Sequence, residues 1–374
     1  MTVSGKPTVG ILTFHGADNY GAVLQAYALS KWLTDHGCHA EIADYRIPEY
    51  DQYRTFRGIR YYLGSPKTLV LDILSMASRR RRSVRFRSFR KQYLPISDRC
   101  WRSAGELAQA ADQYDVWICG SDQIWNPKKV GSELGVFLLD FAGPGNRKVS
   151  YAPSMGVSRP EPEEMAHFVR SLSGFHAVSV READMAELFS PYVGAKIWET
   201  CDPVFLLGDG AYDSMDGKPR LEPYVFLYVV GSAKANAAMI RSAETYSERH
   251  GLRLYYIIDG NRVMFRVRGK SFFGCSPEEF LSLIRQAEHV ISNSFHATAF
   301  SLLFKKSFVT YRKTGTAGRM GHLLERFGMT DRLCGESDDI GPILDRPIEH
   351  RTTGQACADI RTTGESFLTM ALDI

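Results

Sequence analysis

The sequence lacks the features that mark several common classes of protein. Its seven cysteines are scattered, none forms a CxxC pair, and none stands near histidines at metal-ligand spacing. This pattern argues against structural zinc and against a disulfide framework, and it favours a reducing cytoplasm. No apolar run approaches the length of a membrane span, and residues 1–14 contain no secretory hydrophobic region. We therefore expect a cytoplasmic protein.

Glycine-rich phosphate loops and a strong excess of charge are missing as well. The loop from Gly16 to Gly21 matches neither GxGxxG nor GxxxxGK[ST], so neither a dinucleotide-binding fold nor a P-loop is supported. The net charge is +4, which helps with phosphorylated or acidic ligands but falls well short of a dedicated nucleic-acid binder. We expect no nucleic-acid partner.

The composition is that of a globular protein with two domains. The chain has 374 residues, 44% of them hydrophobic and 24% charged, which is too long for one ordinary core. A turn-rich stretch with Gly208, Gly210, Gly217 and Pro219 marks the boundary. The predicted parts are an N-terminal domain (1–207), a C-terminal domain (220–345), and a last segment (346–374) that packs back on the first domain.

Apolar strands alternate with helical segments along both halves. The predicted strands are 9–14, 39–45, 114–120, 148–154 and 177–181 in the first half, and 224–230, 252–259, 290–291 and 307–312 in the second. This alternation predicts parallel sheets. The fold class is therefore α/β, with two Rossmann-like parallel-sheet domains facing a cleft, a GT-B-like arrangement. Ligands would bind where the carboxyl ends of the strands meet the following loops.

The junction between a strand and a helix at 289–304 is the most informative stretch. Ser292, Asn293 and Ser294 are helix-cap residues, and His296 stands at the start of the helix that follows. A helix start offers free N–H groups and partial positive charge, which suit an anionic ligand. The alternative is that His296 only caps or packs, and spacing alone does not decide between the two.

Polar residues also follow the strands of the first half. The opening loop before residue 22 and the loop 120–127 both have the small and polar character of ligand-facing loops. Arg181 ends a strand beside a helix start, where its guanidinium could fork onto a carboxylate or phosphate. The alternatives are a turn capped by Asp122 and a surface ion pair of Arg181 with Glu182 or Asp184.

A basic segment lies between the two strand series of the first domain. It contains Arg79, Arg80, Arg81, Arg82 and further cations up to Lys91, interleaved with Phe86 and Phe89. Three interpretations stay open: a solvated helical face, contact with anionic lipid headgroups, and contact with nucleic-acid phosphates.

Taken in order, several motifs resemble the polysaccharide pyruvyl transferase family. The matching pieces run from the opening loop to residue 332: Asn19–Ala22 with Leu24 and Gln25, GSDQIWNP at 120–127, YAPSMG at 151–156, SVRE at 179–182, the pair Asp202 and Pro203, SFHATAFSLLF at 294–304, and Arg319 ahead of a helix ending near Asp331 and Arg332. Many family members carry Arg two positions before the histidine, where this chain has Ser294. Arg181, Arg312 and Arg319 are then the candidates to bind the donor phosphate.

The resemblance implies transfer of a carboxyethylidene group from phosphoenolpyruvate to two hydroxyls of a sugar, forming a pyruvyl ketal. It assigns catalytic roles to His296, as general acid and base, and to Arg181. The donor-binding candidates are Ser292, Ser294, Arg312 and Arg319. The acceptor-binding candidates are Asn19, Tyr20, Gly21, Ser121, Asp122, Gln123, Trp125 and Asn126. No metal or cofactor is expected, with phosphoenolpyruvate as co-substrate.

The resemblance also implies a place of action and leaves other functions open. The acceptor would be a glycan on a lipid diphosphate, or another glycan precursor of exopolysaccharide or capsule. For an enzyme that works at the inner face of the cell membrane, the basic segment offers peripheral contact through Arg79 to Arg82, and a solvated helical face is the alternative. An alternative enzyme is a GT-B glycosyltransferase that uses a nucleotide sugar. An alternative of another class is a binder of a phosphate-rich polymer through 79–91, which predicts steep salt dependence.

Overall fold

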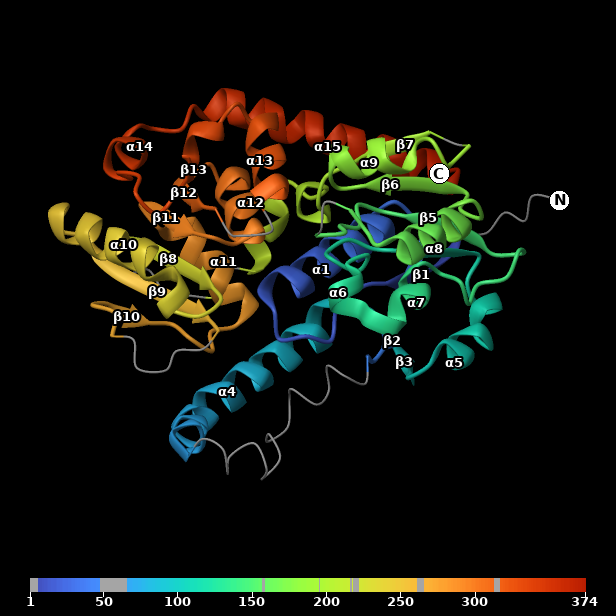
Figure 1. Ribbon diagram of the computed structural model, residues 1–374, viewed down its shortest axis with the longest axis horizontal. Coiled ribbons are helices and arrows are strands. Elements are labelled where there is room, and N and C mark those ends of the chain that lie inside the picture. The colour runs from blue at the N-terminus through green and yellow to red at the C-terminus, as the bar shows by residue number, and fades with distance from the viewer. Residues whose placement is uncertain are drawn as a thin grey trace. The chain divides into compact units, whose positions relative to one another are not determined.

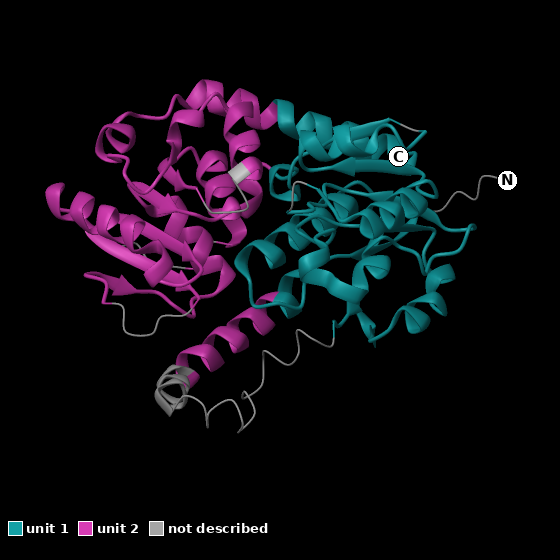
Figure 2. Cartoon of the chain, viewed as in Figure 1, with its two compact units in different colours: residues 1–57, 90–207, 359–374 teal, residues 58–89, 208–358 magenta. Residues whose placement is uncertain are grey.

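The computed structural model describes residues 6–47, 66–156, 159–194, 196–215, 217, 222–260, 266–312 and 317–374; for 66–75 and Ala317 it describes the backbone alone. The chain divides into two compact units. Unit 1 comprises 1–57, 90–207 and 359–374, and unit 2 comprises 58–89 and 208–358 (Figure 2).

Unit 1 is built on a seven-stranded sheet with the order β3-β2-β1-β4-β5-β6-β7, in which each neighbouring pair is parallel. The strands are β1 (Thr8–Leu12), β2 (His39–Tyr45), β3 (Ile96–Trp101), β4 (Val116–Cys119), β5 (Arg147–Ser150), β6 (Ala177–Val180) and β7 (Ile197–Glu199). Strands β4 and β6 are buried at every residue, as parallel strands covered on both faces must be. The helices around this sheet are α1 (Tyr20–Asp35), α5 (Ala104–Ala108), α6 (Pro127–Val130), α7 (Leu134–Phe137), α8 (Pro162–Leu172) and α9 (Ala183–Phe189), as Figure 1 labels them.

Unit 2 repeats the design with a six-stranded sheet of order β10-β9-β8-β11-β12-β13, again parallel throughout. The strands are β8 (Tyr224–Val230), β9 (Arg253–Asp259), β10 (Lys270–Ser271), β11 (His289–Ser292), β12 (Ser307–Tyr311) and β13 (Leu333–Cys334). The helices are α10 (Ala237–Arg249), α11 (Pro277–Gln286), α12 (Phe295–Leu303), α13 (Ala317–Arg326) and α14 (Gly341–Asp345). Short 3-10 turns occur in both units at Ala111–Gln113, Gly131–Glu133, Pro203–Phe205, Asp209–Met215, Lys234–Asn236 and Thr330–Arg332.

Each sheet has one point where the strand order reverses its direction. In unit 1 the reversal lies between β1 and β4, and in unit 2 it lies between β8 and β11. The loops that leave two such strands diverge to opposite faces of the sheet, and ligands of open α/β sheets bind in the resulting crevice. The residues after β1, β4, β8 and β11 are therefore the first place to look for a site in each unit.

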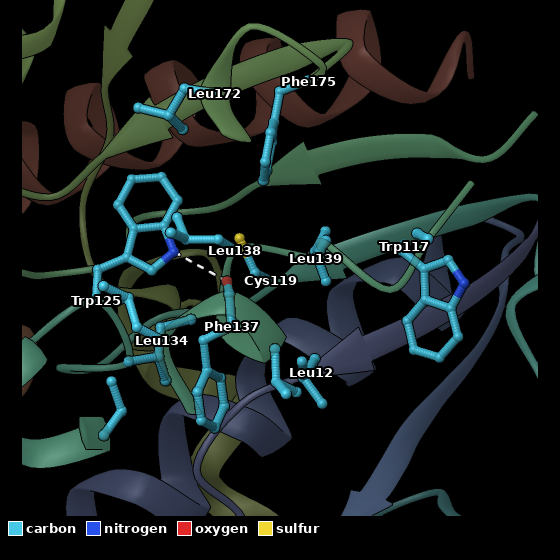
Figure 3. Packing of buried hydrophobic residues seen from close by; sticks show 14 of the residues in the cluster. Leu12, Trp117, Cys119, Trp125, Leu134, Phe137, Leu138, Leu139, Leu172 and Phe175 are labelled. Carbon is cyan, nitrogen blue, oxygen red and sulfur yellow. Dashed lines mark hydrogen bonds between the residues drawn. The ribbon is translucent and has the colours of Figure 1, made fainter. Parts of the chain in front are cut away.

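The core of unit 1 is aromatic and tightly bonded. Trp117 and Trp125 are fully buried, and the indole N–H of Trp125 donates to the backbone oxygen of Phe137 at 3.0 Å (Figure 3). The ring of Trp117 meets Tyr114 edge to face, with centroids 4.7 Å apart. Both indoles are buried and both of their N–H groups are hydrogen-bonded, so these side chains support the neighbouring strand ends rigidly.

Two long helices have residues in both units. They are α4 (Pro66–Tyr93) and α15 (His350–Leu372). The predicted boundary at 207 coincides with a change of unit, but residues 58–89 group with unit 2 and not with the predicted N-terminal domain. The reason is contact: the guanidinium of Arg82 pairs with Asp259 at 2.9 Å, and a Cβ on Gly274 would lie 2.9 Å from the backbone oxygen of Ser78.

The end of α15 belongs to unit 1. Phe367 is fully buried and packs against Tyr151 and Trp198, with ring centroids 6.2 and 5.9 Å away. Residues 346–358 of the predicted last segment group with unit 2 instead. In the part of the chain that the structure describes, no helix has the length and apolar character needed to cross a bilayer.

Candidate functional site

An asparagine holds the switch point of unit 2 in shape. Val230 and Asn293 lie beyond the last residues at which β8 and β11 pair with each other. Val230 N–H donates to Asn293 Oδ1 at 2.7 Å, and Asn293 Nδ2 donates to Val230 O at 3.0 Å. The side-chain amide thus replaces a peptide group of a neighbouring strand, satisfying a buried backbone at the point where the two strands separate. Asn293 Nδ2 also donates to Asn236 Oδ1 at 2.7 Å, which ties in the start of α10.

Two of the predicted donor-binding serines form hydrogen bonds to other groups of the chain. Ser294 is the N-cap of α12, and its hydroxyl accepts from Ala297 N–H at 3.4 Å. Ser292 Oγ donates to Tyr228 O at 2.7 Å and accepts from Ser294 N–H at 3.0 Å. Their exposures are 1% for Ser292 and 8% for Ser294. These hydroxyls shape the turn, so their part in binding a donor is secondary.

His296 is the second residue of α12 and is half-buried. Its ring stands edge to face with Phe295, with centroids 5.5 Å apart. The following residues, Ala297 and Thr298, are buried, which anchors the first turn of the helix in the core. The histidine therefore lies where backbone N–H groups and the helix dipole favour an anion, beside the carboxyl end of β11.

Arg312 follows the neighbouring strand. Strands β11 and β12 pair in parallel up to Ser292 and Thr310, and Arg312 comes directly after β12 with an exposed side chain. Its backbone N–H donates to Cys334 O at 2.9 Å, which fixes the residue at the sheet edge. Because the carboxyl ends of neighbouring parallel strands share one edge, the structure brings His296 and Arg312 to the same side of unit 2.

Two further arginines of the family-matching motifs, Arg319 and Arg332, differ from each other. Arg319 is the third residue of α13 and is half-buried. Arg332 is buried at 3% exposure, and its guanidinium donates to Phe308 O at 2.9 Å and Arg346 O at 2.8 Å. Arg332 therefore ties backbone segments together, and burial lowers its pKa.

Arg181 is part of a buried charge network in unit 1. Its Nη2 lies 2.8 Å from Asp202 Oδ2, both side chains are nearly inaccessible, and it also donates to Ser121 Oγ. Ser121 Oγ donates in turn to Ala152 O at 3.0 Å. The network joins the ends of β4, β5, β6 and β7. The sequence motifs include Asp202 but give no reason to assign it this role.

The loop after β4 is shaped by glycine and by an unusual aspartate. Asp122 has φ of 72°, and its carbonyl accepts from Ser154 N–H at 2.8 Å. A Cβ on Gly156 would lie 2.6 Å from Gln123 Oε1 and Asn126 Nδ2, so only glycine fits beneath this loop. The Asn126 amide donates to Gln123 Oε1 at 2.9 Å.

Several predicted acceptor-binding residues are buried. Ser121 has no exposed surface because it belongs to the Arg181 network, and Trp125 has none because it packs in the core with its N–H satisfied. Tyr20 is fully buried in the first turn of α1. Asn126 is 6% exposed and caps α6. These four side chains therefore have little accessible surface in this structure, and their role in binding an acceptor stays a prediction.

Other predicted acceptor residues are accessible or close to the accessible loop. Asn19 is exposed and caps α1, with its Oδ1 accepting from Ala22 N–H at 3.0 Å. Asp122 and Gln123 are partly exposed. Gly21 is buried in the first turn of α1, where its backbone N–H has no intrahelical acceptor.

Sequence reasoning missed a buried charged cluster after β1 and β2. His15 is 1% exposed; its Nε2 lies 2.8 Å from Asp44 Oδ1, and its Nδ1 lies 3.1 Å from Thr13 O. The guanidinium of Arg46 binds the same carboxylate with Nη2 3.0 Å from Oδ2. Burial opposes ionisation of Asp44, but the hydrogen bonds from His15 and Arg46 outweigh it and lower its pKa to about 2.

A signal for this cluster was present in the sequence. His15 follows the first predicted strand and Asp44 lies at the end of the second, and the two strands pair in parallel. Consecutive strands of an α/β unit are commonly neighbours, so their carboxyl ends meet. Pairing the residues at those two ends would have found it.

Two further observations concern ligands in the described ranges. No three His, Cys, Asp or Glu side chains there are grouped as metal ligands. A groove of about 240 Å³ lies between α10 and the segment 336–341, with Arg241, Arg249 and Asp338 among its lining residues. None of the predicted site residues lines that groove.

Solved structures show which class of protein this fold defines. The chain superposes on a UDP-GlcNAc 2-epimerase from Methanocaldococcus jannaschii with a TM-score of 0.52 at 10% identity, covering 98% of this chain and 99% of that one. A Listeria monocytogenes protein described as a UDP-N-acetylglucosamine 2-epimerase gives 0.56 at 12% identity, covering 98% and 95%. The predicted class, an α/β protein with two Rossmann-like sheets of GT-B type, is confirmed.

The family follows from the sequence. The family model for polysaccharide pyruvyl transferase matches residues 19–312, which is most of the chain and includes the strand-end loops of both sheets. The chain belongs to the polysaccharide pyruvyl transferase family, and the predicted family is confirmed. This membership indicates a transferase of polysaccharide biosynthesis. No curated protein matches the chain.

Proposed function

We propose that this chain transfers a carboxyethylidene group from phosphoenolpyruvate to two hydroxyls of a sugar in a cell-surface polysaccharide precursor. One observation carries the proposal: His296 lies in the first turn of α12, at the carboxyl end of β11, within the range that matches the family. A titratable ring beside an anion-favouring helix start suits a donor that is both anionic and dependent on proton transfer.

The reaction needs two proton transfers at one carbon skeleton. A sugar hydroxyl attacks C2 of phosphoenolpyruvate while C3 receives a proton and becomes a methyl group; His296 accepts the hydroxyl proton and supplies the proton to C3. Phosphate then leaves C2 with the electrons of the C–O bond. The second hydroxyl attacks C2 and its proton passes to the departed phosphate, which closes the ketal and leaves inorganic phosphate.

The donor's carboxylate and phosphate require cations or N–H groups. Unit 2 is the proposed donor side, since it carries His296, Arg312 and Arg319. Arg312 is exposed and follows the strand next to β11, which makes it the first candidate. Arg319 stays a second candidate in unit 2, and the Asp202 partner of Arg181 supports a bracing role for Arg181 in unit 1.

Unit 1 is the proposed acceptor side. Asn19, Asp122 and Gln123 are the predicted acceptor residues whose side chains are at least partly exposed. The acceptor is proposed to be a glycan precursor of exopolysaccharide or capsule, carried on a lipid diphosphate or free. The enzyme would then work at the inner face of the cell membrane as a peripheral protein.

Product analysis separates this function from its nearest alternative. The chain is incubated with a glycan acceptor and either phosphoenolpyruvate or a nucleotide sugar, and released phosphate or nucleoside diphosphate is measured. Acceptor-dependent phosphate release from phosphoenolpyruvate is expected. The GT-B class that the fold defines also fits a glycosyltransferase that uses a nucleotide sugar. Release of UDP or GDP, without phosphate release, would establish that alternative.

A further inference from the structure

Helix α4 buries the face that carries its aromatic residues. Phe86 and Phe89 have no exposed surface, so neither ring is available to stack on a base or to enter a bilayer. Arg82 lies on the same face at 5% exposure, with its guanidinium 5.2 Å from the centre of the Phe86 ring and paired to Asp259. Arg85 pairs with Glu279. This inner face is occupied by unit 2.

The opposite face of α4 has a different composition. Met76 and Val84 are 49% and 55% exposed, and Arg80, Arg87 and Lys91 are exposed around them. These five residues follow one another at intervals of four, four, three and four, which places them on one stripe of a helix. The stripe is about 22 Å long. We call these five residues the outer face of α4.

The cations of the outer face have no acidic neighbours along the helix. From residue 73 to the end of α4 the sequence contains neither Asp nor Glu, whereas Arg79 and Arg81, beside the outer face, add two exposed cations. In the described ranges, large hydrophobic side chains are this exposed at few positions, and two of them fall here. Apolar side chains set among exposed cations, on a stretch of helix without acidic residues, are the composition of an interfacial helix.

Three occupants would treat this face differently. If solvent alone covers this face, the exposure of Met76 and Val84 brings no gain in free energy. A nucleic acid would bind the cations but not the two apolar side chains. An anionic bilayer engages both, because cations meet the headgroups while Met76 and Val84 enter the acyl boundary. We propose that the outer face of α4 rests on the anionic surface of a membrane. This inference supplies the contact surface for the lipid-linked acceptor of the proposed function.

Flotation of the full-length chain with vesicles tests the inference. Vesicles of phosphatidylcholine with phosphatidylglycerol are compared with phosphatidylcholine alone, at low and at high salt. Binding to the anionic vesicles at low salt only is expected. The triple variant R80E/R87E/K91E should bind about a hundredfold more weakly, and M76S/V84S should bind several-fold more weakly.

The matched control changes the same charge elsewhere. R99E/R170E/R351E replaces three exposed arginines outside α4, so it alters the net charge equally but should keep most of the binding. Equal loss in both triple variants would reduce the effect to net charge and overturn the inference. So would failure of the wild-type chain to float with anionic vesicles, or an unchanged affinity of M76S/V84S together with tight binding of single-stranded RNA.

Membrane binding and catalysis are separable in this design. Phosphate release from phosphoenolpyruvate is measured for each variant with a water-soluble glycan acceptor. If R80E/R87E/K91E stays active but does not float, the membrane surface is established apart from the chemistry. If wild-type protein floats but releases no phosphate, the proposed function fails while the membrane surface stands.

Discussion

The two switch points of this chain have the same strand topology, but the side chains at them differ. The edge of unit 1 is filled with paired polar side chains: buried Arg181 with Asp202, and buried His15 with half-buried Asp44 and Arg46. The edge of unit 2 is lined by backbone-binding Ser292 and Asn293, with half-buried His296 and exposed Arg312 beyond them.

The difference indicates a division of labour. Buried ion pairs hold strand ends in one arrangement, because breaking one leaves an uncompensated charge. Accessible titratable and cationic groups at a helix start can bind an anion and move a proton. We therefore propose that unit 1 provides a fixed surface and that unit 2 provides the reacting groups.

The largest expected effect is on turnover, from His296. His296→Gln should lower kcat by roughly two to four orders of magnitude, because the residue that exchanges protons with hydroxyl and donor is lost. The melting temperature should change little, since the ring is half-buried and the cap of α12 is made by Ser294. Phosphate release measures turnover, and His250→Gln in the same unit is the control. Near-normal turnover of the variant would remove His296 from the mechanism.

The next effect is on stability, from unit 1. Asp202→Asn removes the carboxylate partner of buried Arg181 and should lower the free energy of unfolding by about 3 to 5 kcal/mol, as measured in urea. The matched control is Glu248→Gln, which breaks an exposed pair with Arg268 whose side chains are 66% and 60% accessible. That variant should lose less than about 1 kcal/mol. Similar losses in the two variants would contradict a structural role for the buried pair.

Binding of the donor provides a third, smaller effect. Arg312→Lys should raise KM for phosphoenolpyruvate about tenfold without loss of stability, because an ammonium cannot form the planar fork of a guanidinium. Arg332→Lys is the control: it should lower stability and leave KM unchanged, since the guanidinium of Arg332 donates to the backbone oxygens of Phe308 and Arg346. Lysine variants at Arg181 and Arg319 test the other two candidates for donor binding, and unchanged affinity in both would remove these two arginines from the donor site.

The smallest effect concerns acid stability through Asp44. Its pKa is about 2 in the folded chain and about 4 when unfolded, so the unfolded state takes up the proton first as the pH falls. The stabilisation is complete above pH ~4 and is lost as the pH falls towards 2, by about 2 kcal/mol. Urea titrations at pH 6 and pH 3 should show about half of this loss in the wild type and a smaller loss in Asp44→Asn. Equal pH dependence in both would mean that other carboxyls account for it.

The sheets were predictable because parallel strands leave a direct mark on the sequence. Continuous apolar runs such as 116–119 and 224–230 can only be buried strands when helices alternate with them. The junction at His296 was predictable for the same reason, since a strand that ends in Ser and Asn before an apolar helix has one reasonable arrangement.

The rest depended on contacts between distant residues. Helix α4 carries cations on both faces, so the spacing of its residues does not predict that Phe86 and Phe89 face inward. Their orientation depends on the pairing of α4 with Asp259 and Glu279, which are distant in the sequence. The burial of Trp125 depends on Phe137 O as a partner for its N–H. A polar motif next to a strand end looks the same whether it binds a ligand or its own backbone.

The division of labour between the units is tested most directly by a crystal structure with phosphoenolpyruvate bound. We expect density for the donor at the start of α12, with an oxygen of its phosphate or carboxylate within hydrogen-bonding distance of Arg312 and its C3 facing His296. Donor density at the edge of unit 1, on Arg46 or on an Arg181 released from Asp202, would contradict it.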